Sequence, residues 1–522
     1  MTRLQRFGAC ALLAVLGACA PLREDFVRTP SRSLPPATDT AMARHTRADL
    51  DAHPGRSGFR LLARSTNALM SRLVLADQAS RSIDLQYYIY ANDATGRLFS
   101  QRLLAAADRG VRVRVLLDDL DAGDEDGLLE GLDAHPNIEV RLFNPFPFQA
   151  SSLMGKAWQF LFAARRLNRR MHNKSFIVDG VQAIIGGRNI GDAYFDAGKE
   201  RHFRDLDVLF IGPIVAQAAR SFDAYWNSPA AYPVRAYAGE QASAHDLARL
   251  REALTHDARA FSESDYAQMV AEELPDGSSA EQRGGWLWGE ARLIADAPEK
   301  ADPDTEGGGR IAHAVRAALA SARKRAIIIS PYFIPGAHGE QLLDRLAAKG
   351  VELAVLTNSL AASDEPTVHA GYLAYRPALL RAGIDLYEFR PIGGENAAHA
   401  RGKSSGLSLH AKAMVIDRRK VYIGSMNFDP RSRTLNTEMG VIVDSPSLAA
   451  AVEDFFASAS APEHAFHVEP GHCPDRTGPH GRMRWTAVED GRRVCYERDP
   501  EVSAWKRVEL QFWRILPLEA LL

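Results

Sequence analysis

Two short stretches of the chain place a histidine and a lysine two residues apart. One is RRMHNKSFIVDG, residues Arg169–Gly180, and the other is LHAKAMVID, residues Leu409–Asp417. Side chains at positions i and i+2 of a strand point to the same face, so each histidine should project beside its lysine. A charged lysine repels a cation, which argues against a metal site, but it can bind phosphate oxygens while the histidine attacks or transfers a proton. The predicted catalytic pairs are His172 with Lys174 and His410 with Lys412.

Both stretches continue with an asparagine at the same distance. Asn189 and Asn427 are separated by the same offset as the two histidines (427 − 189 = 410 − 172 = 238). Their amides could donate hydrogen bonds to the phosphate that the lysines bind. Two half-sites facing each other would supply one histidine to attack phosphorus and a second to protonate the leaving alkoxide.

Four carboxylates accompany these pairs. Asp179 and Asp417 each follow a lysine by five residues, where the strand is expected to turn, so they are either structural turn residues or part of the chemistry. Asp205 and Glu438 each precede a later apolar strand, and we expect them to orient the far nitrogen of a histidine. The other polar candidates are a competitor of Asp205 and two histidines expected on the surface or in a cleft: Asp207, His202 and His369.

The sequence patterns of the helices and strands that must position these residues occur twice in the chain. In each half a helix stops at a glycine, Gly110 or Gly350, and a valine-rich strand follows. Strands alternate with helices, which is typical of an α/β sandwich, and Asp179-Gly180 is a hairpin signal that favours a mixed sheet. The fold class predicted is therefore α/β, with two tandem sandwich domains of mixed sheets flanked by helices, related by a pseudo-twofold axis.

The chain can be divided into six parts on composition and pattern. With 522 residues it is long enough for two or three domains. The expected parts are a signal peptide with a lipobox at 1–19, a tether at 20–60, a first domain at 61–240, a helical connection at 241–300, a second domain at 301–460 and a C-terminal extension at 461–522.

The N-terminus has the layout of a secretory signal, with basic residues, a short apolar run and small residues. The stretch LGAC resembles a bacterial lipobox, which predicts lipidation of Cys19 and a membrane-associated protein on the periplasmic side of the cell envelope; a plain signal peptide or an uncleaved anchor is the alternative. In an oxidising compartment Cys473 and Cys495 could form a disulfide, and two unpaired thiols are the other reading.

Charge and hydropathy bear on the partners. The net charge of −2 argues against a generally basic nucleic-acid binder. Residues Phe143–Arg170 combine phenylalanines and a tryptophan with a cluster of arginines, which suits either a segment that meets acyl chains and anionic head groups or a helix packed in the core.

The two motifs, HNKSFIVD and HAKAMVID, are similar to the His-x-Lys-x4-Asp signature of the phospholipase D superfamily. Together with GGRN, GSMNFDPRSRTLNTEMG, LTNSLAASD and VHAGY, they make the chain resemble the bacterial cardiolipin synthases, nearest the C type, from about Ala63 to the C-terminus. That subgroup does not require a lipobox, so the predicted compartment rests on the N-terminal sequence and not on the resemblance.

The resemblance implies one active site between two halves, a phosphohistidine intermediate, no metal and no other cofactor. Carried over to this chain, the catalytic set is His172, Lys174, Asp179, His410, Lys412 and Asp417, supported by Asn189, Asn427, Asp205 and Glu438. His172 is expected to be the nucleophile and His410 the acid and base, although the symmetry of the motifs does not decide this.

A phosphatidyl group would then pass between phospholipids at a membrane surface, with phosphatidylglycerol as substrate and phosphatidylethanolamine as a further candidate. The alternatives are hydrolysis to phosphatidic acid, since only exclusion of water separates the two outcomes, a phosphodiesterase that cuts nucleic acid, and a lipid-binding protein without activity.

Overall fold

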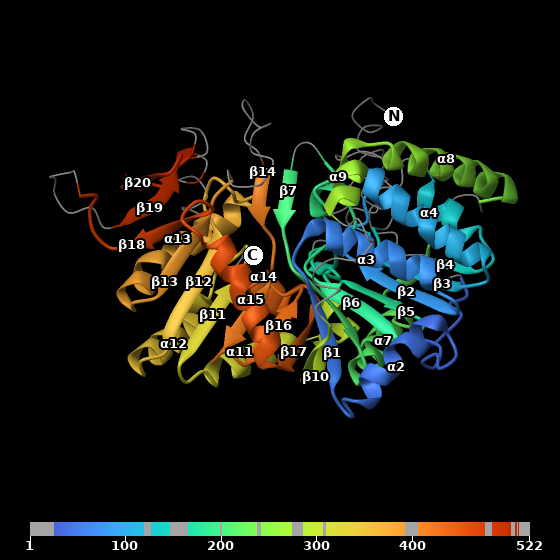
Figure 1. Ribbon diagram of the computed structural model, residues 1–522, viewed down its shortest axis with the longest axis horizontal. Helices are drawn as coiled ribbons and strands as arrows, with labels where there is room; N and C mark the ends of the chain where they lie inside the picture. Colours follow the sequence, from blue (N-terminus) through green and yellow to red (C-terminus); the bar gives the residue numbers. More distant parts are fainter. Residues whose placement is uncertain are drawn as a thin grey trace, which may run out of the picture.

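The computed structural model describes residues 26–119, 127–146, 165–198, 201–236, 242–273, 285–305, 309–391, 406–474, 483–502, 507, 508 and 510. It shows two α/β halves side by side, the first running from blue to green and the second from yellow to red (Figure 1). The predicted fold class is confirmed.

The sheet of the first half is mixed. Its strands lie in the order β9-β4-β3-β2-β5-β6-β8-β1, with β2, β3 and β4 parallel and the other neighbours antiparallel. The bounds are β1 Ser57–Leu62, β2 Ser82–Tyr87, β3 Arg112–Asp118, β4 Ile138–Phe143, β5 Ser175–Val178, β6 Gln182–Gly186, β8 Asp207–Ile211 and β9 Ala231–Pro233.

The second half repeats this order. Its strands lie as β18-β13-β12-β11-β15-β16-β17-β10, again with three parallel strands, and β19 and β20 extend the edge beyond β18. Because β1 pairs with β10, both halves belong to one continuous sheet. The bounds are β10 Leu287–Ala295, β11 Arg325–Ile329, β12 Glu352–Asn358, β13 Asp385–Phe389, β15 Ala413–Ile416, β16 Lys420–Gly424, β17 Met439–Asp444, β18 Ala465–Glu469, β19 Arg484–Glu489 and β20 Arg492–Tyr496.

Helices cover both faces of each sheet. Alternate residues of a strand face opposite sides, so each half has its own outer core, while a third core contains buried residues from both sheets together with α7 and α15. The helices are α2 Ala41–Asp51, α3 Ser65–Gln78, α4 Ala94–Asp108, α5 Leu128–Asp133, α7 Pro213–Trp226, α8 Ala244–Ser262, α9 Asp265–Glu273, α11 Arg310–Ala320, α12 Gly336–Ala348, α13 Pro366–Arg381, α14 Pro430–Thr434 and α15 Pro446–Ala459, with short 3-10 turns η1 Asp192–Tyr194, η2 Val234–Ala236 and η3 Pro298–Ala301. The shared core fixes the two halves relative to each other.

The borders of the parts differ from those expected from composition. The expected connection, 241–300, contains α8 and α9 but also β10, a strand of the second sheet. The expected extension after residue 460 adds β18, β19 and β20 to that sheet. A disulfide joins Cys473 to Cys495, with the two Cα atoms 5.7 Å apart. The described part of the extension is therefore built into the second half.

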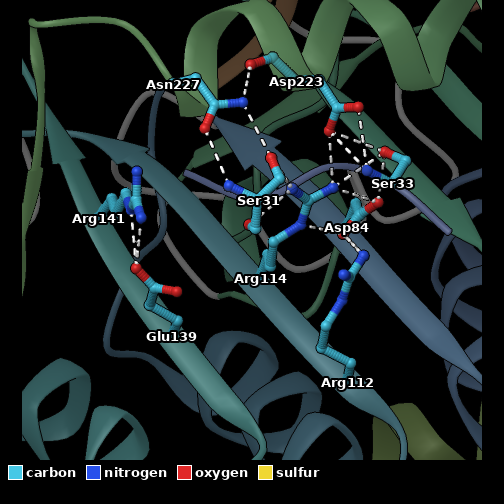
Figure 2. A network of polar contacts seen from close by, with 9 residues as sticks. All are labelled: Ser31, Ser33, Asp84, Arg112, Arg114, Glu139, Arg141, Asp223 and Asn227. Carbon is cyan, nitrogen blue, oxygen red and sulfur yellow. Dashed lines mark hydrogen bonds and ion pairs between the residues drawn. The ribbon is translucent and has the colours of Figure 1, made fainter. Parts of the chain in front are cut away.

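The described part of the expected tether, 26–60, is also built into the protein, because it contains α2 and the start of β1. Residues 26–40 pack against the first half as a strap. Arg114 and Asp84 form a buried ion pair on the sheet, with 2.7 Å between Nε and Oδ1. Ser33 bridges this pair to α7, because its hydroxyl lies 2.9 Å from Asp84 and its backbone N–H donates to Asp223 at 2.9 Å (Figure 2). The Arg114 guanidinium also donates to the Ser31 carbonyl at 3.1 Å. Composition predicts flexibility here, but the buried charges need polar partners and the strap supplies them.

No helix in the described ranges is long and apolar enough to cross a membrane.

Candidate active site

The two halves meet through short parallel β contacts beside each His-x-Lys segment. β7 (Arg201–Arg204) pairs with β14 (Gly406–Leu409), and the two strands stand side by side between the halves (Figure 1). On the other side of the axis, Met171 pairs with Thr437 in a single parallel bridge. The backbone N–H of His410 donates to Arg204 at 2.8 Å, and that of His172 donates to Thr437 at 2.9 Å. Each His-x-Lys segment therefore lies beside the residue that precedes the candidate acid of the opposite half.

Each histidine pairs with a carboxylate from the other half. His172 Nδ1 lies 2.9 Å from Glu438 Oε2, and His410 Nδ1 lies 2.5 Å from Asp205 Oδ2. All four side chains are buried or nearly so. Because Nδ1 faces the carboxylate, Nε2 of each ring is left for chemistry. The competitor Asp207 instead binds Arg72 at 2.9 Å, so its role is structural.

The two lysines are buried without a carboxylate partner in the described structure. Lys174 Nζ donates to the His172 carbonyl at 2.8 Å, and Lys412 Nζ donates to the His410 carbonyl. Burial lowers the pKa of Lys174 to about 7 and that of Lys412 to about 8. Binding of a phosphate would compensate this burial, because an anion favours the charged ammonium.

The asparagines keep one unsatisfied polar atom each. Asn189 accepts a hydrogen bond from the Ile89 backbone at 3.1 Å, while its Nδ2 is buried with no partner among the described residues. The Oδ1 of Asn427 is likewise buried without a partner in that part of the chain. Buried polar atoms of this kind are rare unless a ligand or water satisfies them, so both side chains are suited to bind a substrate.

Asp179 and Asp417 lie at the opposite ends of β5 and β15 from the histidines. The Asp179 carboxylate accepts hydrogen bonds from the backbone N–H groups of residues 80, 81 and 82 at 2.8–3.3 Å. Asp417 does the same for residues 323, 324 and 325 at 2.7–3.2 Å. Both residues have positive φ, 54° and 53°, as is usual for an aspartate in a tight turn. Of the two readings left open by the sequence, this placement favours the structural one.

Glycine is required beside one of the acids. A Cβ atom on Gly187 would lie 2.1 Å from Asp205 Oδ1, so a larger residue would displace this carboxylate from His410. The GGRN stretch therefore has two roles. Gly187 leaves room for the Asp205 carboxylate that binds His410, and Asn189 is a candidate substrate ligand.

Electrostatics distinguish the two dyads. Burial lowers the pKa of His172 well below its ordinary value, and the charges of Lys174 and Lys412 lower it further. Burial raises the pKa of Glu438 to about 7. Burial would also raise the pKa of Asp205, but His410 and Lys412 outweigh it and hold that pKa below its usual range. The pKa of His410 is lowered by burial and by Lys412, against the opposing charge of Asp205.

Sequence reasoning missed several residues of the site. Ser425, in the GSMN stretch, donates its hydroxyl to the same Glu438 oxygen that faces His172, at 2.5 Å. Aromatic rings flank both histidines: Tyr88 lies 4.9 Å from the His172 ring, and Tyr194 and Phe203 lie 5.4 and 5.0 Å from the His410 ring, between centroids. Ser425 could have been found beside Asn427 in the repeated motif. Tyr194 and Phe203 could not, because they lie in the connection from Asn189 to Asp205, which is longer than its counterpart from Asn427 to Glu438.

The remaining sequence candidates lie elsewhere. His202 is half-buried near Asp196, and His369 is buried beside Arg376. Cys19 and residues 147–164 of the amphipathic segment lie outside the described residues, although Phe143 and Phe146 at its start are buried. In the described part of the chain no group of three or more His, Cys, Asp or Glu side chains could hold a metal ion.

The chain is similar to several known proteins. A family model described as "Cardiolipin synthase, PLD-like domain" matches residues 73–226 and 315–459. Cardiolipin synthase C of Escherichia coli (strain K12) is 42% identical over 90% of this chain and 97% of its own length. Cardiolipin synthase 2 of Bacillus anthracis is 27% identical over 72% of this chain and 60% of its own length. The crystal structure of phosphatidylserine synthase from Haemophilus influenzae is similar in fold, with a TM-score of 0.56 at 13% identity over 92% of this chain and 99% of that chain.

Proposed function

Because the chain belongs to the family of phospholipase D-like cardiolipin synthases, we propose that it makes cardiolipin through a covalent phosphohistidine. The observation that carries the proposal is the pair of His–carboxylate dyads, each built from both halves. Among the described residues, the two histidines keep Nε2 unengaged and the two lysines form no ion pair with a carboxylate, which suits the transfer of an anionic phosphatidyl group.

His172 is the proposed nucleophile. Its lowered pKa keeps the imidazole neutral, and a neutral Nε2 can attack phosphorus. The new N–P bond forms as the bond from phosphorus to the headgroup oxygen breaks, and the headgroup leaves as an alcohol after taking a proton from His410 Nε2. Asp205, held ionised, stabilises the His410 imidazolium that supplies this proton.

The second half of the reaction reverses these roles. His410, now neutral, accepts the proton of the incoming hydroxyl, whose oxygen attacks phosphorus and releases His172. Lys174 and Lys412, with the amides of Asn189 and Asn427, would bind the phosphate oxygens throughout. We assign Asp179 and Asp417 the role of holding the strand ends, because their carboxylates are engaged by backbone N–H groups.

Phosphatidylglycerol is the proposed acceptor, since its free hydroxyls can attack the intermediate, and phosphatidylglycerol or phosphatidylethanolamine is the proposed donor. Hydrolysis to phosphatidic acid would follow the same steps, except that water attacks the intermediate in place of a lipid hydroxyl. Burial of both histidines, each with no more than 8% of its surface exposed, favours transfer because it limits access of water.

We further propose attachment to the membrane through a lipidated Cys19 on the periplasmic side. The LGAC stretch supports the anchor. The Cys473–Cys495 disulfide supports the compartment, because disulfides persist in oxidising environments.

The test uses the full chain in detergent with labelled phosphatidylglycerol, alone and with phosphatidylethanolamine, in EDTA. Cardiolipin made by the wild type and absent with His172→Ala and His410→Ala is the expected result. Phosphatidic acid as the main product would assign a hydrolase instead. Turnover of DNA with none of any lipid would refute the lipid reaction.

A further inference from the structure

A tyrosine–aspartate pair lies in the loops next to the dyads. Tyr332 donates its hydroxyl to Asp364 Oδ1 at 2.9 Å. Both side chains are half-buried. In the described residues no basic group forms an ion pair with Asp364, and its Oδ2 has no hydrogen bond there. A half-buried carboxylate with one free oxygen is unexpected beside a site built to bind an anion, since its charge repels phosphate.

Two sets of hydrogen bonds hold the loops of Tyr332 and Asp364 close to Asn427 and His410. The Tyr332 loop is fixed to the residue after Asn427, because Phe428 donates to the Ser330 hydroxyl at 3.1 Å and accepts from Ile334 at 2.6 Å.

The Asp364 loop follows β12, whose last residue is Asn358. The Asn358 side chain binds both the N–H and the carbonyl of Leu409, at 2.8 and 2.9 Å. Leu409 directly precedes His410, so the pair belongs to the His410 side of the site.

The negative charge of Asp364 affects the pKa values of groups around His410. Burial lowers the pKa of Lys412, and the negative charge of Asp364 is among those that oppose this shift. Burial raises the pKa of Tyr194, whose ring packs on His410, and Asp364 raises it further. Burial and Asp364 also raise the pKa of Tyr332, which keeps this hydroxyl protonated as the donor to Asp364.

The first half has no equivalent tyrosine. Ile83 and Ala326 occupy the same register, since they pair with Val178 and Ile416 (416 − 178 = 238), and counting six residues onward matches Ile89 to Tyr332. The equivalent bridges at Tyr90 and Phe333 confirm this match. The Tyr332–Asp364 pair therefore lies on the side of His410. If His172 is the nucleophile, the headgroup alcohol leaves on this side and the acceptor enters there.

We propose that Asp364, held by Tyr332, determines headgroup specificity by accepting a hydrogen bond from the polar end of the alcohol that leaves or enters at His410. This rests on the proposed function. The shared chemistry is a hydrogen-bond donor carried by the alcohol, which is a hydroxyl in phosphatidylglycerol and an ammonium in phosphatidylethanolamine. A carboxylate suits both, and the nearby buried Oδ1 of Asn427 is a second acceptor for the same group.

The experiment compares three donor lipids in mixed micelles with the full-length enzyme: phosphatidylglycerol, phosphatidylethanolamine and phosphatidylmethanol, whose headgroup has no donor. Release of each headgroup alcohol is measured for wild type, Asp364→Ala, Asp364→Asn and Tyr332→Phe. Asp364→Ala should lower kcat/KM for a recognised headgroup, relative to phosphatidylmethanol, by about ten- to hundredfold, as expected for loss of a hydrogen bond to a charged group. Tyr332→Phe should shift the same ratio less.

The Asn variant distinguishes the two headgroups. It keeps an accepting oxygen but loses the charge, so it should restore part of the preference for a hydroxyl and little of that for an ammonium. Asp344→Asn, an exposed aspartate on α12 in the same half, is the matched control and should leave every ratio unchanged. Thermal melts check folding of each variant.

An equal fall for all three lipids, or no change for any, would overturn the specificity role. Neither result would affect the proposed synthesis of cardiolipin, which the wild-type product tests separately.

Discussion

The two halves share one strand order and one backbone plan, yet their His–carboxylate dyads are not equivalent. In the dyad of His410 the acid is an aspartate whose pKa is held low by its surroundings. In the dyad of His172 the acid is a glutamate whose pKa is raised by burial to about 7 and whose facing oxygen is shared with Ser425. The repeated fold therefore forms the His–carboxylate geometry twice. Differences in burial and in neighbouring groups give the two histidines different proton affinities.

The connections next to the dyads differ as well. From Asn189 to Asp205 the chain takes 16 steps (205 − 189), but from Asn427 to Glu438 it takes 11 (438 − 427). The longer first-half loop forms β7, which makes a ladder with β14, whereas among the described residues the other side pairs through the single Met171–Thr437 bridge. Asymmetric loops around a symmetric centre would allow the proposed division of roles, in which one histidine is the nucleophile and the other transfers protons.

The largest effect should come from the histidines, and it should distinguish them. Either alanine variant is expected to lose about 10⁴-fold or more in turnover. With a lipid labelled in its phosphate, His410→Ala should still form some covalent adduct on His172, whereas His172→Ala should form none. Peptide mass spectrometry after rapid quenching at alkaline pH locates the adduct. A label on His410 instead would reverse the assignment of the two halves.

The next largest effect should come from the acids. Asp205→Asn is expected to lower kcat by about a hundredfold, because it removes the ionised partner that stabilises the His410 imidazolium. Glu438→Gln should cost less, about tenfold, because Glu438 is already partly protonated near neutral pH. Steady-state kinetics with phosphatidylglycerol would measure both, and equal losses would indicate that the dyads work identically.

The pH dependence of stability should separate the same two acids. Burial raises the pKa of Glu438 from 4.5 to about 7, so between these values the folded protein keeps a proton that the unfolded chain has released. Stability should therefore fall as pH rises through this window. The fall in Tm between about pH 5 and pH 7 should be smaller in Glu438→Gln than in wild type. Asp205→Asn should retain the fall, since its pKa is shifted downward and its contribution changes only at lower pH.

The turn aspartates should affect stability rather than chemistry. Asp179 is buried, with 1% of its surface exposed, and Asp417 is half-buried. Replacing either by Asn weakens hydrogen bonds to three backbone N–H groups, at a cost of about 2 kcal/mol for Asp179 and about 1 kcal/mol for Asp417. Denaturant unfolding measures the cost, with kcat determined on the folded fraction. A large fall in kcat for an Asp179→Asn protein that remains stable would indicate that this residue takes part in the reaction.

The smallest effect is expected in the strap, which has no counterpart in the described part of the second half. Ser33→Ala removes the hydroxyl that links Asp84 to Asp223 but leaves the Arg114–Asp84 ion pair. We expect a loss of about 1 kcal/mol in the free energy of unfolding, measured by denaturant titration. Ser264→Ala, in the linker between α8 and α9, is a control for the general cost of removing a serine hydroxyl, because this hydroxyl donates to the Phe261 carbonyl and accepts from the Ala267 N–H.

The repeat and the mixed sheets could be predicted, and the candidate site residues could be proposed, because they rest on local patterns. The His-x-Lys spacing, the strand alternation and the shared 238-residue offset are visible in the chain itself. The exchange of acids between halves could not be predicted, because it depends on contacts between residues more than 200 positions apart. The packing of the strap was missed for a related reason. Its composition is typical of a flexible segment, and the buried Arg114–Asp84 pair that it covers appears only after folding.

The packed strap also limits how far the enzyme can travel from the bilayer. With the proposed lipid on Cys19, only seven Cα-to-Cα steps separate the anchor from Phe26, where the described chain begins (26 − 19 = 7). At full extension these steps span about 25 Å, roughly the thickness of a small domain. The enzyme would then search for lipids within a thin layer along the surface, and its encounter rate would follow the density of lipids in the membrane plane instead of their bulk concentration.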